Sequence, residues 1–316
     1  MSAFLALLDF SFGVTGPIFV LLGLGVLLRR IGLITDAFIA AGSRLVFAIG
    51  LPTMLFVSIA RTRIADSASV GMLVYGVVAT VAIWLLMEAL ASFVVQPARD
   101  RGVVVQGAFR SNFGVVGLAY CANAYGEAGL TMASLYVGVL TILVNVLAVI
   151  TLSRSLHRSQ GVGKVARGIA TNPLIIGILL ALPVSAFAIP LPAVAMKSAG
   201  YIADMTLPLA LLCTGATLDF RSLRAEAGNT LLAATGKLVA MPLVFTLGAW
   251  AVGFRSMELG VLMLMASAPS AAASYAMVRA MGGNATLAAN IIALTTLGSL
   301  LTTSAGVLLL RGFGLI

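Results

Sequence analysis

The chain of 316 residues is 61% hydrophobic and only 9% charged, and its mean hydropathy is +1.12. A soluble domain carries about 25% charged residues, so this composition excludes a soluble globular fold. The formal net charge of +9 does not point to nucleic acid, because the basic residues lie in short connections between apolar stretches, where such residues orient membrane proteins.

Apolar segments of about 20 residues, the length that crosses the hydrocarbon core as a helix, follow one another along the chain. The first of them is preceded by Asp9 and by no small-residue cleavage pattern, so we do not expect a removed signal peptide. Charged residues, prolines and glycines separate the segments. The ten predicted transmembrane helices lie near residues 12–28, 43–60, 70–95, 102–125, 129–152, 170–187, 201–218, 229–252, 259–280 and 286–310.

Lysine and arginine residues are unevenly divided between the two sets of predicted loops. If the N-terminus lies outside, the inner loops hold twelve basic residues, and the outer loops and the C-terminus hold five. Cytoplasmic loops of membrane proteins carry such an excess. We therefore expect a multi-pass protein of the cell (inner) membrane with both termini outside.

Four landmarks of the first half recur in the second half, in the same order and at a nearly constant shift. Each half contains five predicted spans, and an odd number gives the halves opposite orientations, as in the inverted repeats of secondary transporters. We predict a first five-helix repeat at 1–155, a cytoplasmic connecting loop at 156–168 and a second, inverted repeat at 169–316. The matched pairs are Pro17 and Pro173, and Pro52 and Pro208, each 156 apart, and Asn112 and Pro269, and Gly126 and Gly283, each 157 apart.

The fourth predicted span contains polar residues and glycines that a simple membrane helix does not need. Its central stretch, AFRSNFGVVGLAYC at 108–121, places Arg110-Ser111-Asn112 before Gly114 and Gly117. Glycine weakens a helix by about 1 kcal/mol relative to alanine, although small residues also serve close helix packing.

The ninth span is interrupted at the corresponding position by Ser267, Pro269 and Ser270. Proline removes a backbone donor and opposes helix continuation. Because the interruptions match, we predict two broken helices that cross near the membrane midplane, where freed amides at half-helix N-termini face an anion. The candidate substrate-binding residues from these spans are Arg110, Ser111, Asn112, Gly114, Gly117, Pro269 and Ser270.

Three charged residues, Glu88, Arg110 and Lys237, lie within predicted spans, each about 12–16 Å from the inner end. A charge at such depth costs about 2.5–3.5 kcal/mol, and clustering offsets part of this cost. We predict that Glu88 pairs with Lys237, Arg110 or both, either as a static ion pair or as a proton-coupling element. Arg110 has an alternative role, in which it attracts a substrate carboxylate.

Seven segments, in this order and spacing, resemble the auxin efflux carrier family, in particular its compact bacterial members, which are often described as malonate or organic-acid permeases. The resemblance covers essentially the whole chain. It implies a ten-helix fold like that of the bile-acid sodium symporters, with a scaffold domain and a crossover domain, and a homodimer. The segments are LGLGVLLRRIGLIT (22–35), RSNFGVVGL (110–118), NPLIIGILLAL (172–182), LPLALLCTGATL (207–218), GKLVAMPLV (236–244), ASAPSAAASYAMVRAMGG (266–283) and LTTLGSLLTT (294–303).

The resemblance also implies that asparagines of the fourth and fifth spans bind a substrate carboxylate, which adds Asn145 to Asn112 as a candidate site residue. The alternative for Asn145 is an interhelical hydrogen bond. Relatives often have a proline where this chain has Ala119, so the first break must depend on Asn112 and the glycines. The span-ten counterparts would be Asn290, Thr295 and Thr296.

These features predict an all-α secondary transporter that moves a small organic anion (malonate, another dicarboxylate or an auxin-like carboxylate) by alternating access, either coupled to protons or uncoupled. In this mechanism spans four and nine move against a scaffold that includes spans two and seven. A sodium-coupled symporter of the bile-acid type is the alternative, but residues 267–283 contain no Asp, Glu, Asn or Gln for sodium.

An intramembrane enzyme would need a nucleophile with a base, paired aspartates or metal ligands. The single histidine, His157, falls in the connecting loop, and no Gly-x-Ser-x-Gly motif is present. We therefore expect no catalytic residue, no cofactor, no metal site and no nucleic-acid partner.

Overall fold

The computed structural model describes residues 2–60, 70–156, 170–171, 173–217 and 226–316. The predicted connecting loop at 156–168, with His157, therefore lies outside the described residues, apart from Leu156. In the described parts of the chain every regular element is a helix.

Each of the ten predicted ranges contains helix in its described residues, and the fourth and ninth ranges are interrupted at 110–112 and 268–272. In the first half these are α1 (Ser2–Arg30), α2 (Asp36–Leu45), η1 (Val46–Gly50), α3 (Leu51–Ala60), α5 (Val70–Val94), η2 (Ala98–Asp100), α6 (Arg101–Phe109), η3 (Phe113–Gly117) and α7 (Leu118–Ser155). In the second half they are α9 (Pro173–Ala186), α10 (Ala193–Thr217), α11 (Ala227–Thr235), η5 (Gly236–Ala240), α12 (Met241–Val252), α13 (Ser256–Ser267), α14 (Ala273–Met281) and α15 (Ala285–Gly312).

Six helical stretches in the described residues have the length and apolarity needed to cross a bilayer, and one of them, 113–155, is kinked at Gly126. Large apolar side chains project from several of them into the surroundings; Phe93, Val194 and Leu301 are 84%, 79% and 73% exposed. Such a surface is unfavourable in water and is suited to lipid. The six helices are 36–57, 70–94, 113–155, 193–217, 227–252 and 285–312.

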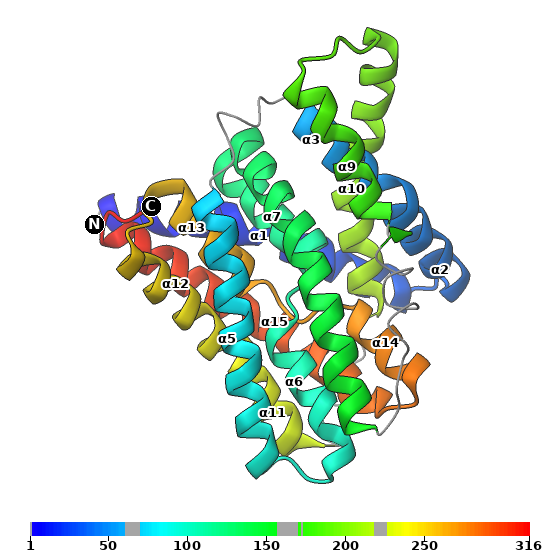
Figure 1. Cartoon of the computed structure of the whole chain (residues 1–316). Coiled ribbons are helices and arrows are strands. Elements are labelled where there is room, and N and C mark those ends of the chain that lie inside the picture. The colour runs from blue at the N-terminus through cyan, green and yellow to red at the C-terminus, as the bar shows by residue number, and fades with distance from the viewer. Residues whose placement is uncertain (1, 61–69, 157–169, 172, 218–225) are drawn as a thin grey trace.

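The helices form two groups on either side of α7 (Figure 1). One group contains α2, α3, α9 and α10, and the other contains α5, α6, α11, α12 and α13. Glycine allows the closest approaches in the first group and between it and α1. A Cβ on Gly25 of α1 would lie 3.0 Å from the backbone nitrogen of Ala216 in α10, and one on Gly177 of α9 would lie 2.6 Å from the carbonyl oxygen of Pro52 in α3.

Two π-helical turns, η1 and η5, are each followed two residues later by a proline, Pro52 and Pro242. Proline cannot donate a hydrogen bond, and its ring displaces the carbonyl four residues before it. The helix absorbs this displacement by widening, so that the amide of Leu51 bonds to the carbonyl of Val46, five residues back. The same spacing recurs at the end of η5, the turn that carries Lys237.

The matched landmarks of the two halves differ in local detail. Pro17 lies inside α1, whereas Pro173 is the first residue of α9. In the predicted glycine pair, Gly126 has a positive φ (61°), but in the second half the positive φ (79°) lies at Gly282 rather than at Gly283. Gly126 and Gly282 are 156 residues apart. That spacing equals the shift of the proline pairs.

Candidate functional site

The fourth predicted span is broken where the sequence indicates. Helix α6 ends at Phe109, and the chain becomes extended at Arg110 (φ −86°, ψ 92°) and leaves helical angles at Asn112 (φ −77°, ψ 63°). A new helix begins at Phe113 with η3 and continues into α7. Arg110-Ser111-Asn112 therefore forms an extended segment between two half-helices.

The ninth span is broken in the same way. Helix α13 ends at Ser267, Ala268 is extended (φ −58°, ψ 139°), and α14 begins at Ala273. Pro269 lies directly after the extended residue, where its missing N–H breaks no helical hydrogen bond.

The two extended segments cross and pair with each other. Ser111 and Ser270 form an isolated antiparallel bridge. The amide of Asn112 donates to the carbonyl of Pro269 over 2.7 Å, and the amide of Ala271 donates to the carbonyl of Arg110 over 2.9 Å. Unpaired backbone groups are costly in a bilayer, so each broken helix supplies the partners that the other lacks.

Side chains complete this crossing at the half-helix ends. The hydroxyl of Ser270 donates to the carbonyl of Gly107 near the end of α6 over 2.5 Å, and its amide donates to the Thr295 hydroxyl over 3.1 Å. On the other half, the ammonium of Lys237 donates to Ser111 Oγ and, over 2.6 Å, to the carbonyl of Ala266 near the end of α13.

The predicted ion pair between Glu88 and Lys237 or Arg110 is wrong within the described residues. Lys237 is fully buried and bonds to neutral acceptors. Glu88 is only partly buried and lies near Trp84 and Arg154.

The reason is the rotation of α5 about its axis. Met87 faces η5, since a Cβ on Gly236 would lie 3.0 Å from its Cε. Glu88 is the next residue and is turned by about 100°. It shares its face with Trp84, whose Nε1 donates to Thr151 of α7 over 3.2 Å. Glu88 and Lys237 were predicted at a similar depth in the membrane, but the rotation of α5 keeps their side chains apart.

A cavity of about 390 Å³ lies beside the crossing and contains Arg110 in its lining; we call it the Arg110 cavity. Its volume is within the range of small-molecule sites. Of the predicted site residues, Arg110, Ser111, Asn112, Gly114 and Asn145 line it. The remaining lining residues are Ser43, Val46, Phe47, Leu51, Phe113, Val115, Thr141, Val144, Ala210, Cys213, Thr214, Ala271, Ala272 and Ala273.

Positive charge and helix dipoles converge on the Arg110 cavity. Arg110 is 7% exposed; its Nη2 donates to Asn145 Oδ1 over 2.6 Å, and its Nη1 lies 3.7 Å from Met277 Sδ. Among the described residues no carboxylate is within ion-pair distance of it. The N-terminal ends of η3 and α14 also border the cavity, and such ends favour anions.

Three predicted site residues do not line the Arg110 cavity: Gly117, Pro269 and Ser270. Gly117 allows close packing against α13, since a Cβ there would lie 2.7 Å from Met265 Sδ. Pro269 and Ser270 hold the crossing through the hydrogen bonds described above. The sequence predicted correctly that Pro269 and Ser270 lie at the break. It did not indicate that they stabilise the crossing rather than line the Arg110 cavity.

The predicted counterparts in span ten, Asn290, Thr295 and Thr296, are buried in α15. Thr295 supports the second extended segment at Ser270. The hydroxyl of Thr296 donates to the carbonyl of Ile292 in its own helix. None of the three lines the Arg110 cavity.

Sequence reasoning missed several lining residues, among them Ser43, Thr141, Cys213 and Thr214. Thr141 and Asn145 are four residues apart on α7, a spacing that places them on one helix face. That spacing was a usable signal for Thr141. No pattern in the sequence around Cys213 and Thr214 indicates that α10 lies against the face of α7 that carries Thr141 and Asn145.

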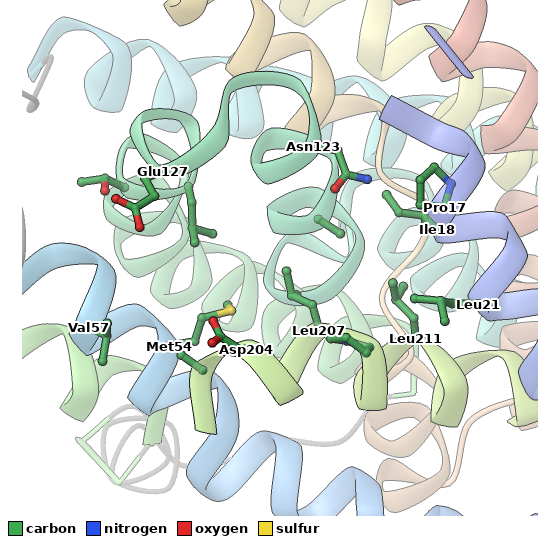
Figure 2. Close-up of a pocket in the computed structure, with 15 residues that line it drawn as sticks. Pro17, Ile18, Leu21, Met54, Val57, Asn123, Glu127, Asp204, Leu207 and Leu211 are labelled. Atoms are coloured by element: carbon green, nitrogen blue, oxygen red, sulfur yellow. The ribbon is translucent and has the colours of Figure 1, made fainter. Parts of the chain in front are cut away.

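A second cavity, of about 350 Å³, lies between α1, α3, α7 and α10, and we call it the Glu127 cavity. Figure 2 shows Glu127 and Asn123 of α7 on one side of it and Asp204 of α10 on the other. Sequence reasoning did not identify these residues, although each is a polar group in an apolar region. The cavity carries two acidic side chains, whereas the Arg110 cavity carries a cation.

The two cavities lie along the same pair of helices at different heights. On α7 after the kink at Gly126, the Glu127 cavity is lined by residues within 127–131 and the Arg110 cavity by residues within 141–145. On α10 the two linings adjoin, within 203–211 and within 210–214. The separation along α7 is roughly 15–20 Å. Among the described residues none lines both cavities. Buried Val137 and Leu140 lie between them on α7.

In the part of the chain that the structure describes, no group of three or more His, Cys, Asp or Glu side chains is placed to hold a metal ion. The polar groups that border the Arg110 cavity are its arginine, amides, hydroxyls and helix ends. This set of groups suits a small anion.

Two comparisons with known proteins bear on this arrangement. A family model described as membrane transport protein matches residues 14–305. A protein of Methanothermobacter thermautotrophicus described as an uncharacterized transporter is 26% identical over 262 residues, which are 80% of this chain and 83% of that protein.

Proposed function

This chain belongs to the membrane transport protein family, whose model matches residues 14–305, and we propose that it carries a small organic anion through the Arg110 cavity. The family match confirms the resemblance to the auxin efflux carriers. The substrate class is a carboxylate of the size of malonate, another dicarboxylate or an auxin-like acid.

The observation that carries this proposal is the state of Arg110. A buried guanidinium without an acidic partner is costly, because its charge is removed from water without compensation. Its hydrogen-bonded neighbour Asn145 orients it but brings no negative charge. A substrate carboxylate would supply that charge and would accept two parallel hydrogen bonds from the guanidinium.

The helix ends beside Arg110 add to the same preference. Amides at the start of η3 and α14 border the cavity, and each helix N-terminus is equivalent to roughly half a positive charge. The substrate carboxylate would lie between these ends and Arg110, with Asn112 and Thr141 as further hydrogen-bonding groups.

An inverted repeat with alternating access is the mechanism we propose. The shift of 156 between Gly126 and Gly282 supports the repeat, as does the pairing of Asn112 with Pro269 across the halves. Closely packed helix pairs also exchange partners between halves: α1 packs on α10, and α9 packs on α3. Movement of the crossing against α3 and α10 would close one cavity and open the other.

The orientation of this pathway follows from the basic loops. With the N-terminus outside, α10 and the part of α7 after the kink at Gly126 both run inward, and the Arg110 cavity lies nearer their inner ends. We propose that it opens to the cytoplasm and that the Glu127 cavity opens to the outside. The membrane would be the inner (cell) membrane.

A flux screen in proteoliposomes tests the function. Radiolabelled carboxylates, neutral analogues and amines would be compared, with pH and sodium gradients varied separately. We expect uptake of at least one carboxylate above protein-free vesicles, without a need for sodium. Flux that requires a sodium gradient would favour the bile-acid type alternative, and flux of amines alone would contradict the proposal.

Asn112→Ala extends this test to the site. Asn112 lines the Arg110 cavity, and the variant keeps its backbone bond to Pro269. We expect weaker binding of the best carboxylate, with the protein still folded. Unchanged binding would show that the site is misplaced.

A further inference from the structure

Lys237 is a fully buried amine at the crossing of the two broken helices. It projects from the π turn η5 and reaches three acceptors. These are the hydroxyl of Ser111, the carbonyl of Ala266 at 2.6 Å and the thioether of Met241 at 3.0 Å. Ser111 belongs to the first extended segment and Ala266 to the end of α13, so one side chain joins both halves of the crossing.

These contacts match a protonated amine. An ammonium group has three donors and no acceptor, and three acceptors surround Lys237. The hydroxyl of Ser111 directs its own proton toward Met241 Sδ, 3.7 Å away, which leaves its lone pairs free to accept from Lys237. The last carbonyls of a helix carry partial negative charge, so the position beside Ala266 favours a cation.

Four of the described elements packed against η5 contain no acidic residue. They are α6, α11, α12 and α15, and their charged residues are Arg101 and Arg311. Helix α5 also contacts η5, through Met87, and its acidic residue Glu88 lies on the neighbouring face with Trp84. In α13 the acidic residue is Glu258, eight residues before Ala266 and thus about 12 Å along the helix. The ammonium therefore adds a net positive charge to the crossing.

A hydroxyl and a main-chain carbonyl are oxygen ligands of the kind that a hard cation binds. We propose that the Lys237 ammonium is a built-in cation that takes the place of a bound alkali-metal ion at the crossing. It joins Ser111 to Ala266 and adds positive charge behind the Arg110 cavity, so that an anion binds there without sodium. The part that concerns anion binding rests on the proposed function; the cation position itself does not.

Thermal unfolding of the purified full-length protein tests the cation position without a substrate. Lys237→Ala removes the ammonium and leaves space, Lys237→Met fills the space without charge, and Lys197→Ala removes an exposed lysine of α10 as a control. We expect Lys237→Ala to unfold at a lower temperature than the wild type. Methylammonium should raise its Tm by several degrees in a saturable manner, relative to choline, and should leave Lys237→Met and Lys197→Ala unchanged.

The proposal is overturned if methylammonium changes the Tm of Lys237→Ala no more than that of the wild type. If Lys237→Ala does not fold, wild-type malonate binding in sodium chloride and in choline chloride decides the matter. Equal affinities are expected, and an affinity more than tenfold higher in sodium would contradict a built-in cation. If Lys237→Ala folds and the wild type binds neither malonate nor the other carboxylates in either salt, the proposed function fails, while the methylammonium result on Lys237→Ala still decides the role of Lys237.

Discussion

Arg110 Nη2 donates to Asn145 Oδ1 over 2.6 Å, which links the first extended segment to the C-terminal half of α7. The two residues are 35 positions apart and come from different predicted spans. The contact fixes the position of the guanidinium beside Asn145, and both residues are part of the lining of the Arg110 cavity.

Asn145→Ala is expected to weaken carboxylate binding about tenfold. A hydrogen bond to a charged group contributes about 1.5–3 kcal/mol, and 1.4 kcal/mol corresponds to a factor of ten in Kd. Equilibrium binding of the best carboxylate from the flux screen measures the effect. Asn229→Ala, which removes an asparagine that bonds to Gln96 away from the cavity, should bind normally. Equal affinity in both variants would exclude a role for Asn145 in orienting Arg110.

Gly25→Ala is expected to lower the Tm, because the added Cβ would approach the backbone of Leu212 and Ala216 in α10. Backbone atoms cannot move aside as a flexible side chain does, so α1 and α10 must separate. Gly23→Ala is the matched control, since a Cβ there meets nothing within 4 Å. It should leave the Tm unchanged or raise it slightly, as alanine favours a helix by about 1 kcal/mol over glycine. A similar Tm for both variants would show that this packing contributes little.

The breaks at Asn112 and Pro269 could be predicted from sequence because their causes are local. Proline and glycine act on the few residues around them, and matched interruptions in two halves indicate a shared role. The membrane character and the approximate helix ranges were predictable for the same reason, since composition and spacing determine them.

The contacts of Glu88 could not be predicted, because depth in the membrane does not specify rotation about the helix axis. Met87 rather than Glu88 faces η5, and no residue near Glu88 in the sequence indicates this. The Glu127 cavity was missed for a related reason. Its walls come from four helices that are far apart in the chain.

Asp100 gives a pH dependence of stability that can be measured outside the membrane spans. Burial raises the pKa of this carboxyl; a hydrogen bond from Asn284 lowers it, Glu226 raises it and Arg99 lowers it. Its Oδ1 is buried and accepts no hydrogen bond from the described residues. A carboxyl whose pKa is higher in the folded state loses stability when it ionises.

We therefore expect the wild type to lose stability as the pH rises above about 4, the ordinary range of an aspartate. Asp100→Asn should lack this component, so its Tm relative to the wild type should rise between pH 4.5 and pH 8. Thermal unfolding across this range measures the difference. A relative Tm that falls with pH would mean that the ionised carboxylate stabilises the start of α6 instead.

Asp204→Asn is expected to increase anion entry from the side of the Glu127 cavity. Asp204 and Glu127 both line that cavity, and acidic groups at a cavity mouth lower the local concentration of anions. Removing one should increase the initial uptake rate about 2–5-fold at low salt, and the gain should shrink near 0.15 M salt, where the Debye length is about 8 Å. A rate that stays unchanged at low salt would separate this cavity from the anion pathway.

The central claim is that Arg110 holds the transported anion, and its most direct test is carboxylate binding by Arg110→Gln in purified protein. Loss of one partner of a buried charge pair costs about 2–5 kcal/mol, so binding should weaken at least about 30-fold. Arg30→Gln, at the exposed end of α1, should bind as the wild type does. If folded Arg110→Gln binds the carboxylate with wild-type affinity, the Arg110 cavity is not the anion site.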